Sequence, residues 1–276
     1  MRIDAHHHVW RLARGDYGWL TPEMTAIYRD FPPEDLAPAL ATARIDRTVL
    51  VQAAPSEAET RWLLETAAQT SFVAGVVGWV DFDGGDATRR IEECARDTRL
   101  VGLRPMIQDI GADDWMLGDA ATEAARAMAE AGLRFDALVK PRHLPHLRRF
   151  VARHRDLRIV IDHGAKPDIA TGAFDDWLAM MRAVAAEGDV HCKLSGLITE
   201  AAADWTDADV TPYIEALIDV FGPYRLMWGS DWPVLNLKGD YARWAGLCAR
   251  ATARLKADEQ AAIWGETAVA FYGLAT

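Results

Sequence analysis

The stretch Arg2-Ile3-Asp4-Ala5-His6-His7-His8-Val9-Trp10 places three consecutive histidines at the end of a short, mostly apolar segment. Side chains alternate along a β-strand, so His6 and His8 are expected on one face and His7 on the other. An open nucleotide-binding sheet usually carries a glycine-rich turn after its first strand, and this chain has histidines there instead. The stretch therefore favours another kind of parallel sheet.

Seven further segments rich in Val, Ile, Leu or Phe follow, and each has the composition of a buried strand. The eight segments are Arg2–His8, Arg47–Ala53, Phe72–Val80, Leu100–Met106, Arg134–Lys140, Arg158–His163, Val190–Ser195 and Arg225–Asp231. Helical stretches separate them, with Ser56 and Glu59 as an expected capping box and Thr206 or Asp207 as another helix start. The alternation predicts an α/β protein, a single-domain (β/α)8 TIM barrel over residues 1–276.

Polar residues gather where these strands are expected to end, which in a parallel barrel is the end that carries the active site. They are His6 and His8 on the first segment, Arg104 and Gln108 at the fourth, Lys140 at the fifth, His163 at the sixth, Lys193 at the seventh, and Asp231 and Trp232 at the eighth. The long connection after the first segment adds Tyr17 and Trp19. Each residue alone has a structural explanation, but their joint placement favours a functional site.

Composition narrows the class of protein. The formal net charge of −11 argues against a general nucleic-acid binder, which needs a basic surface. The three cysteines are odd in number and far apart, so neither a disulfide framework nor a thiolate zinc site is indicated, and a reducing compartment fits best. No signal peptide or membrane span is visible. We therefore expect a cytoplasmic protein with no membrane partner, and a homo-oligomer stays open.

Six motifs resemble the amidohydrolase superfamily, of the amidohydrolase-2 type, and within it the lactonase branch. They are Asp4–Trp10, Gly15–Leu20, Gly102–Pro105, Asp162–Pro167, Lys193–Leu197 and Met227–Pro233. The resemblance runs from residue 3 to about residue 273. The branch includes L-fuconolactonase-like and L-rhamnonolactonase-like enzymes that open sugar lactones, and pyrone dicarboxylate lactonases. The resemblance thus implies an enzyme, a carboxylic-ester hydrolase acting on a small-molecule lactone.

The chain departs from the full superfamily pattern at two metal-binding positions. Lys140 stands where a metal-binding histidine is expected, and Arg104 stands at the metal-bridging position. Two cations there would repel a two-metal centre. No cofactor is strictly required in the lactonase branch, and one divalent zinc ion is optional. Its ligands would be His6, His8 and Asp231, with His163 as a further candidate.

The resemblance also suggests a mechanism. Asp231 is expected to deprotonate the attacking water as general base. Arg104 and Lys140 are expected to stabilise the oxyanion, and His163 or protonated Asp231 to return a proton to the leaving oxygen. The residues expected to bind substrate are Tyr17, Trp19, Gln108, Lys193 and Trp232.

The lactone itself is open at this point. A sugar lactone is favoured because the loop residues Asp16, Tyr17 and Trp19 suit hydroxyl groups and a sugar ring, and because few arginines are placed to bind a dicarboxylate. The alternatives are an aromatic-degradation lactone of the pyrone dicarboxylate or muconolactone type, and a metal-dependent decarboxylase of the same superfamily. A non-enzymatic barrel that binds a sugar acid is the alternative from another class.

Overall fold

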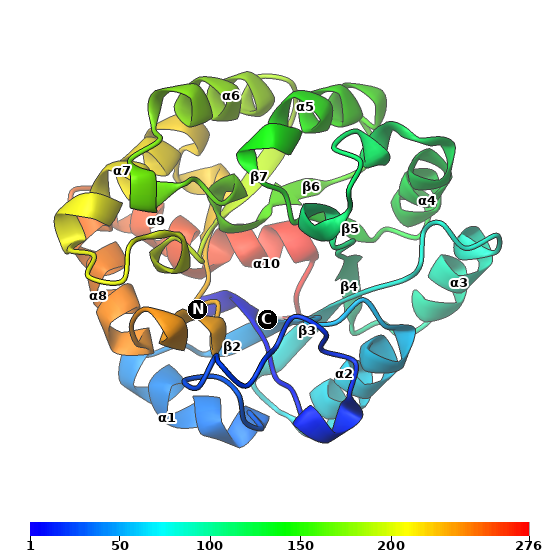
Figure 1. Cartoon of the computed structure of the whole chain (residues 1–276), viewed down its shortest axis with the longest axis horizontal. Coiled ribbons are helices and arrows are strands. Elements are labelled where there is room, and N and C mark those ends of the chain that lie inside the picture. The colour runs from blue at the N-terminus through cyan, green and yellow to red at the C-terminus, as the bar shows by residue number, and fades with distance from the viewer. Residues whose placement is uncertain (276) are drawn as a thin grey trace.

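The computed structural model describes residues 1–275 and contains one sheet of eight parallel strands. The strands are β1 (Ile3–His7), β2 (Arg47–Val51), β3 (Val73–Gly78), β4 (Leu100–Leu103), β5 (Arg134–Ala137), β6 (Ile159–Ile161), β7 (Val190–Leu194) and β8 (Leu226–Trp228). Each strand pairs with the next one along the chain. All eight predicted strands are present, and the predicted (β/α)8 barrel is confirmed (Figure 1).

The barrel closes between its last and first strands just beyond the end of β8. The backbone N–H of Asp231 donates to the carbonyl of His6 at 2.8 Å, and the N–H of His8 donates to the carbonyl of Trp232 at 2.7 Å. Deeper in the barrel, the buried Asp4 carboxylate accepts from the backbone N–H of Ser230 at 2.8 Å. The hydrogen bonds that close the barrel therefore involve His6, His8 and Asp231, which are expected to belong to the active site.

Helices surround the strands (Figure 1). They are α1 (Pro33–Ala43), α2 (Glu57–Gln69), α3 (Ala87–Cys94), α4 (Asp119–Glu130), α5 (Leu144–Arg153), α6 (Asp175–Ala185), α7 (Asp207–Phe221), α8 (Tyr241–Thr252), α9 (Ala257–Ala261) and α10 (Thr267–Tyr272). Within the described chain, none is long and apolar enough to cross a membrane.

The expected helix starts are largely present. Thr206 caps α7, and the side chain of Ser56 accepts the N–H of Glu59 at 3.2 Å at the start of α2. Glu59 departs from the expected capping box, because its carboxylate accepts the backbone N–H groups of Ala53 and Ala54 instead. It thereby holds the turn that follows β2.

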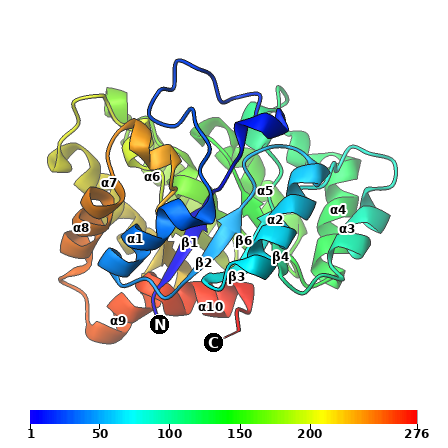
Figure 2. The same ribbon diagram turned by 90° about the horizontal axis from the view of Figure 1, so that it is seen from below.

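The two ends of the barrel are covered differently. Helix α10 lies across the end where the strands begin, and the chain termini lie at that same end (Figure 2). There Phe271 and Tyr272 pack on an apolar layer inside the barrel. The layer consists of Ile3, Ala5, Val49, Val51, Val77, Val101, Val160 and Met227. The connection 8–32 stands over the opposite end, so a ligand has to enter there (Figure 2).

Gly229 is required by the close approach of β8 to β1. A Cβ atom at this position would lie 2.8 Å from the Cβ of His6 and 3.0 Å from its backbone nitrogen. Gly229→Ala should therefore lower the free energy of unfolding by about 1–3 kcal/mol in urea titrations, because overpacking forces backbone shifts. Gly111→Ala is the control, since nothing lies within 4 Å of its added Cβ, and it should change stability by less than about 0.5 kcal/mol. Equal effects of both variants would contradict this account of the closure.

Candidate active site

Asp231 stands at the centre of the site, three residues beyond β8. Its φ of +61° lies in the left-handed region, which non-glycine residues rarely adopt and which is often found at functional sites. The carboxylate Oδ1 lies 3.3 Å from Nε2 of His8, 3.8 Å from Nε2 of His6 and 3.8 Å from Nε2 of His163. Burial raises the pKa of Asp231, but His163 and His8 outweigh it and hold the pKa below its usual value. Asp231 is therefore ionised at neutral pH.

The three consecutive histidines alternate as predicted. The Nε2 atoms of His6 and His8 are 3.2 Å apart, whereas His7 faces Thr48 with its Nε2 2.8 Å from the hydroxyl oxygen. Nδ1 of His8 lies 2.8 Å from the carbonyl of Val51 and must donate to it. When His8 is neutral, its Nε2 consequently carries a lone pair directed into the site.

His163 follows β6 in a run of left-handed residues, with a φ of +54°. Its Nδ1 lies 2.8 Å from the hydroxyl oxygen of Ser195. Gly196 leaves room for the ring, since a Cβ there would lie 2.5 Å from Nδ1. Burial lowers the pKa of His163 to about 4, so the ring is neutral at physiological pH.

A network of buried charges lies beneath these residues. The ammonium group of Lys193 lies 2.5 Å from Oδ2 of Asp136, 3.1 Å from Oδ1 of Asp162 and 3.0 Å from Nδ1 of His6. The two carboxylates compensate the charge of the ammonium group. Arg104 also contacts Asp162, at 3.3 Å. Burial raises the pKa of Asp162, but Lys193, His6 and Arg104 outweigh it and hold the pKa well below its usual range.

This network corrects the expectation that Lys193 binds substrate. The side chain is fully buried and its ammonium group is surrounded by protein acceptors, so it supports His6 from below. Asp136 and Asp162 were not expected in the network. Each is a carboxylate within or directly after an apolar strand. A charged residue in such a position is almost never buried unless it is paired, so the sequence did indicate that both carboxylates have buried partners.

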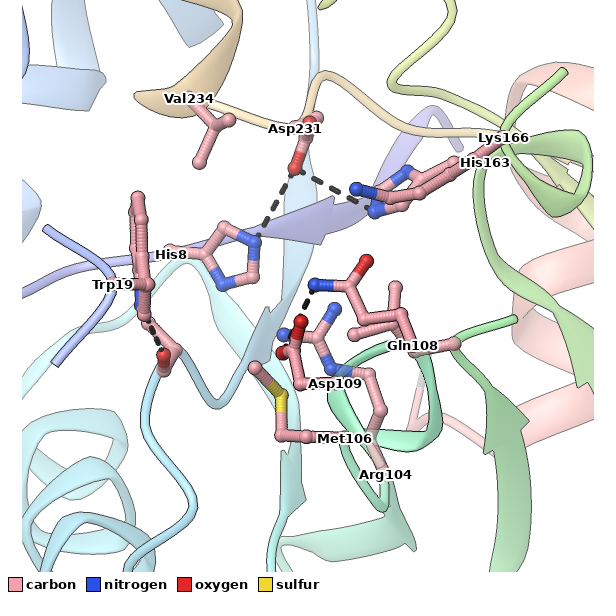
Figure 3. Close-up of a pocket in the computed structure, with 12 residues that line it drawn as sticks. His8, Trp19, Arg104, Met106, Gln108, Asp109, His163, Lys166, Asp231 and Val234 are labelled. Atoms are coloured by element: carbon pink, nitrogen blue, oxygen red, sulfur yellow. Dashed lines mark hydrogen bonds and ion pairs between the residues drawn. The ribbon is translucent and has the colours of Figure 1, made fainter. Parts of the chain in front are cut away.

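A pocket opens above the network at the end of the barrel covered by residues 8–32 (Figure 3). It is lined by His8, Trp19, Ala53, Arg104, Met106, Gln108, Asp109, Leu138, His163, Lys166, Asp231 and Val234. Six expected site residues are therefore on its wall: His8, Trp19, Arg104, Gln108, His163 and Asp231. Lys166 and Asp109 also line the pocket but were not among the expected site residues, because they lie in loops whose course is not fixed by strand alternation.

Other expected residues are not on the wall of the pocket. Tyr17 and Trp232 are buried, and Trp232 packs against Phe31 with ring centroids 5.3 Å apart. Lys140 lies three residues beyond β5, where its backbone N–H donates to Nδ1 of His143 at 2.9 Å. His143 itself is fully buried. The second cation beside His6 is thus Lys193, and the second cation lining the pocket is Lys166.

The donor atoms of the site are compatible with one divalent metal ion. Potential ligand atoms of His6, His163 and Asp231 all lie within 4.8 Å of one another, and His8 adds a fourth. Separations of 3.2–3.8 Å between neighbouring donors resemble the roughly 3.3 Å between ligands of a tetrahedral zinc ion. His8 also has the usual second bond of a metal-bound histidine, from Nδ1 to a carbonyl.

A parallel barrel with a buried carboxylate and three histidines at its open end is typical of an enzyme. The amidohydrolase family model matches residues 3–274, so the chain belongs to the amidohydrolase family.

Two relatives are similar to the chain over nearly their whole length. The chain is 49% identical over 275 residues to an L-fucono-1,5-lactonase of Burkholderia ambifaria, covering 98% of this chain and 95% of that protein. It is 38% identical to an L-fucono-1,5-lactonase of Burkholderia multivorans, covering 99% and 96%. A crystal structure of an amidohydrolase from Burkholderia multivorans with bound zinc superposes with a TM-score of 0.93 at 36% identity, covering 100% of both chains.

The lowered pKa of His163 predicts an acid-sensitive fold. Below pH 6.5 the unfolded chain binds a proton that the folded chain does not bind until about pH 4, so the free energy of unfolding must fall as the pH falls between these values. The contribution is on the order of 3 kcal/mol. We expect His163→Gln to flatten this dependence in urea titrations of chelator-treated protein. The control His146→Gln, on α5, should keep the wild-type slope; an unchanged slope in His163→Gln would refute the assignment.

Proposed function

We propose that the protein hydrolyses a sugar lactone, with an aldono-1,5-lactone such as L-fucono-1,5-lactone as the leading candidate. The observation that carries the proposal is the ionised, buried Asp231 on the wall of a pocket that also contains Arg104 and His163. The 49% identical lactonase supports the same chemistry.

Asp231 acts as general base in this proposal. A water molecule in the pocket would donate a hydrogen bond to its carboxylate while attacking the lactone carbonyl. The low pKa keeps the carboxylate ready to accept a proton at neutral pH, and the left-handed backbone directs it toward the histidines. A positioned base of this kind contributes typically about 100- to 10,000-fold in rate.

Arg104 stabilises the negative charge that develops on the carbonyl oxygen. Its guanidinium group lies on the pocket wall and is held by the carbonyl of Gln52 and by Asp162, so it needs little reorganisation. Lys140 had been expected to assist. We assign that role to Lys166, because it lines the pocket and Lys140 does not.

His163 returns a proton to the ring oxygen when the lactone opens. Its Nε2 lies 3.8 Å from the Asp231 carboxylate, so the proton taken from water would pass between the two groups through one bridging water molecule. The ring oxygen then needs no proton donor other than His163. The low pKa of His163 makes its protonated form a strong acid, which suits transfer to an alkoxide.

Zinc is an optional component of this mechanism. Where it binds, the residues His6, His8, Asp231 and His163 would hold it, and it would lower the pKa of bound water. Arg104 lies 3.3 Å from Nε2 of His6, so a second ion beside the first would meet a fixed positive charge.

The pocket wall suits a sugar ring. The indole of Trp19 is fixed by a hydrogen bond from its Nε1 to the carbonyl of Ala53 at 2.7 Å and offers an apolar face. Gln108 adds an amide that can bond to hydroxyl groups.

The direct test is a pH-indicator assay with aldonolactones, muconolactones and a pyrone dicarboxylate, each with and without chelator. We expect acid release from an aldonolactone with kcat/KM at least tenfold above that for the pyrone dicarboxylate. A pyrone dicarboxylate preferred by more than about tenfold, roughly 1.4 kcal/mol of transition-state preference, would reassign the substrate class. Activity lost with chelator and restored by zinc would make the metal essential.

Asp231→Asn tests the base. The amide has nearly the same shape but cannot take a proton from water, so kcat should fall about 100- to 10,000-fold while the fold is retained. Circular dichroism and the unfolding midpoint check the fold, and single-turnover kinetics measure the chemical step. Activity near that of the wild type would move the base role to another residue, of which His163 is the nearest.

A further inference from the structure

We propose that Asp109 determines substrate specificity: it accepts hydrogen bonds from hydroxyl groups of a neutral sugar lactone and excludes lactones that carry an additional carboxylate. The inference rests on the proposed function and adds the feature that separates one lactone class from another.

Asp109 belongs to a short 3-10 turn, Ile107–Asp109, that follows β4. Both Gln108 and Asp109 line the pocket, and Figure 3 shows their side chains below those of Asp231 and His163. The turn is fixed to its neighbours. The backbone N–H of Gln108 donates to the carbonyl of Leu138 at 3.0 Å, and Arg142 donates to the carbonyl of Gln108 at 3.1 Å.

This side of the pocket presents hydrogen-bond acceptors. The Gln108 amide nitrogen donates to Oδ2 of Asp109 at 3.2 Å, which turns the Gln108 oxygen away from the carboxylate. That oxygen is buried and has no hydrogen-bond partner among residues 1–275. A carboxylate accepts at both oxygens and donates at neither. A ligand that meets this wall must therefore bring donors, and sugar hydroxyl groups are donors.

The charges of the pocket point in the same direction. Its charged lining residues are Arg104, Lys166, Asp109 and Asp231. Both cations are paired within the protein, Arg104 with Asp162 at 3.3 Å and Lys166 with Glu200 at 3.4 Å, and both are assigned to the lactone carbonyl, which leaves neither for a second carboxylate. Asp109 has no ion-pair partner in the part of the chain that the structure describes, so its negative charge faces the ligand uncompensated.

Arg142 does not neutralise Asp109. Its guanidinium group is bound to Asp113 at 2.8 Å and to the Gln108 carbonyl. A lactone with an additional carboxylate would thus approach a free negative charge with no free arginine to bind it, which is the arrangement that specificity by repulsion requires.

The test compares two lactones that differ in one group: an aldonolactone, and the aldarolactone of the same ring size, which carries a carboxylate in place of the hydroxymethyl group. Steady-state kinetics are measured for the wild type, Asp109→Asn and Asp109→Ser. We expect the wild type to prefer the neutral lactone. Asp109→Asn keeps the side-chain size and removes the charge, so kcat/KM should fall about tenfold for the neutral lactone, mainly through KM, and rise about tenfold for the anionic one.

Asp114→Asn is the matched control. Asp114 lies on the same connection, is exposed, and does not line the pocket, so the variant loses the same charge without changing the site. Both lactones should keep their wild-type kcat/KM within about twofold. Asp109→Ser should reproduce the change in preference, and unfolding midpoints identify any variant whose fold has changed.

The outcomes distinguish a failure of the role proposed for Asp109 from a failure of the proposed function. If the wild type hydrolyses the neutral lactone and neither Asp109 variant changes the preference by more than threefold, the role of Asp109 is overturned and the proposed function stands. A wild-type preference for the anionic lactone, or an equal fall for both lactones, also overturns it. If the wild type hydrolyses neither lactone, the proposed function fails, and this inference fails with it.

Discussion

The hydrogen bond from the Asp231 N–H to the His6 carbonyl joins the last strand of the barrel to the first. Together with the bond from the His8 N–H to the Trp232 carbonyl, it removes the two open edges of the sheet and fixes the carboxylate of Asp231 relative to the histidines of β1. Closing the barrel and assembling the site are consequently the same structural event. Gly229 permits the close approach, and Asp4 supports it with a second, deeper contact through Ser230. The left-handed backbone of Asp231 is maintained because the residues on both sides of it are hydrogen-bonded, Ser230 to Asp4 and Trp232 to His8.

In the interior below the site, every buried charge must be paired. Lys193, Asp136, Asp162 and Arg104 form a compact charged group inside a hydrophobic barrel, where an unpaired charge would be costly. Each member has partners, and the Tyr272 hydroxyl donates to Asp136 at 2.7 Å from below. Replacing one member would leave the others uncompensated and would also release His6. The catalytic face therefore also depends on Lys193, Asp136 and Asp162, which do not line the pocket.

Strand alternation was enough to predict the barrel, the shared face of His6 and His8, and the position of Asp231. It failed where the chain leaves the strands. Lys140 follows β5 by three residues, just as Asp231 follows β8, but only the turn after β8 is hydrogen-bonded to β1. Lys140 bonds to His143 instead and does not line the pocket, whereas Lys193 lies within β7 and is fully buried. Asp109 and Lys166 reach the pocket because of turns whose geometry depends on distant partners, such as the Leu138 carbonyl and Glu200. The sequence around Asp109 and Lys166 does not predict those partners.

The closure between β1 and β8 has a consequence for synthesis on the ribosome. Residues 3–8 are translated first, but the groups that complete their hydrogen bonding are residues 230–232, more than two hundred positions later. Until then β1 presents an open edge with unpaired backbone groups, and nascent chains with such edges are prone to aggregate. Helix α10, which seals the other end, emerges later still. Truncated translation products of this protein should thus be clients of chaperones, whatever the stability of the finished barrel.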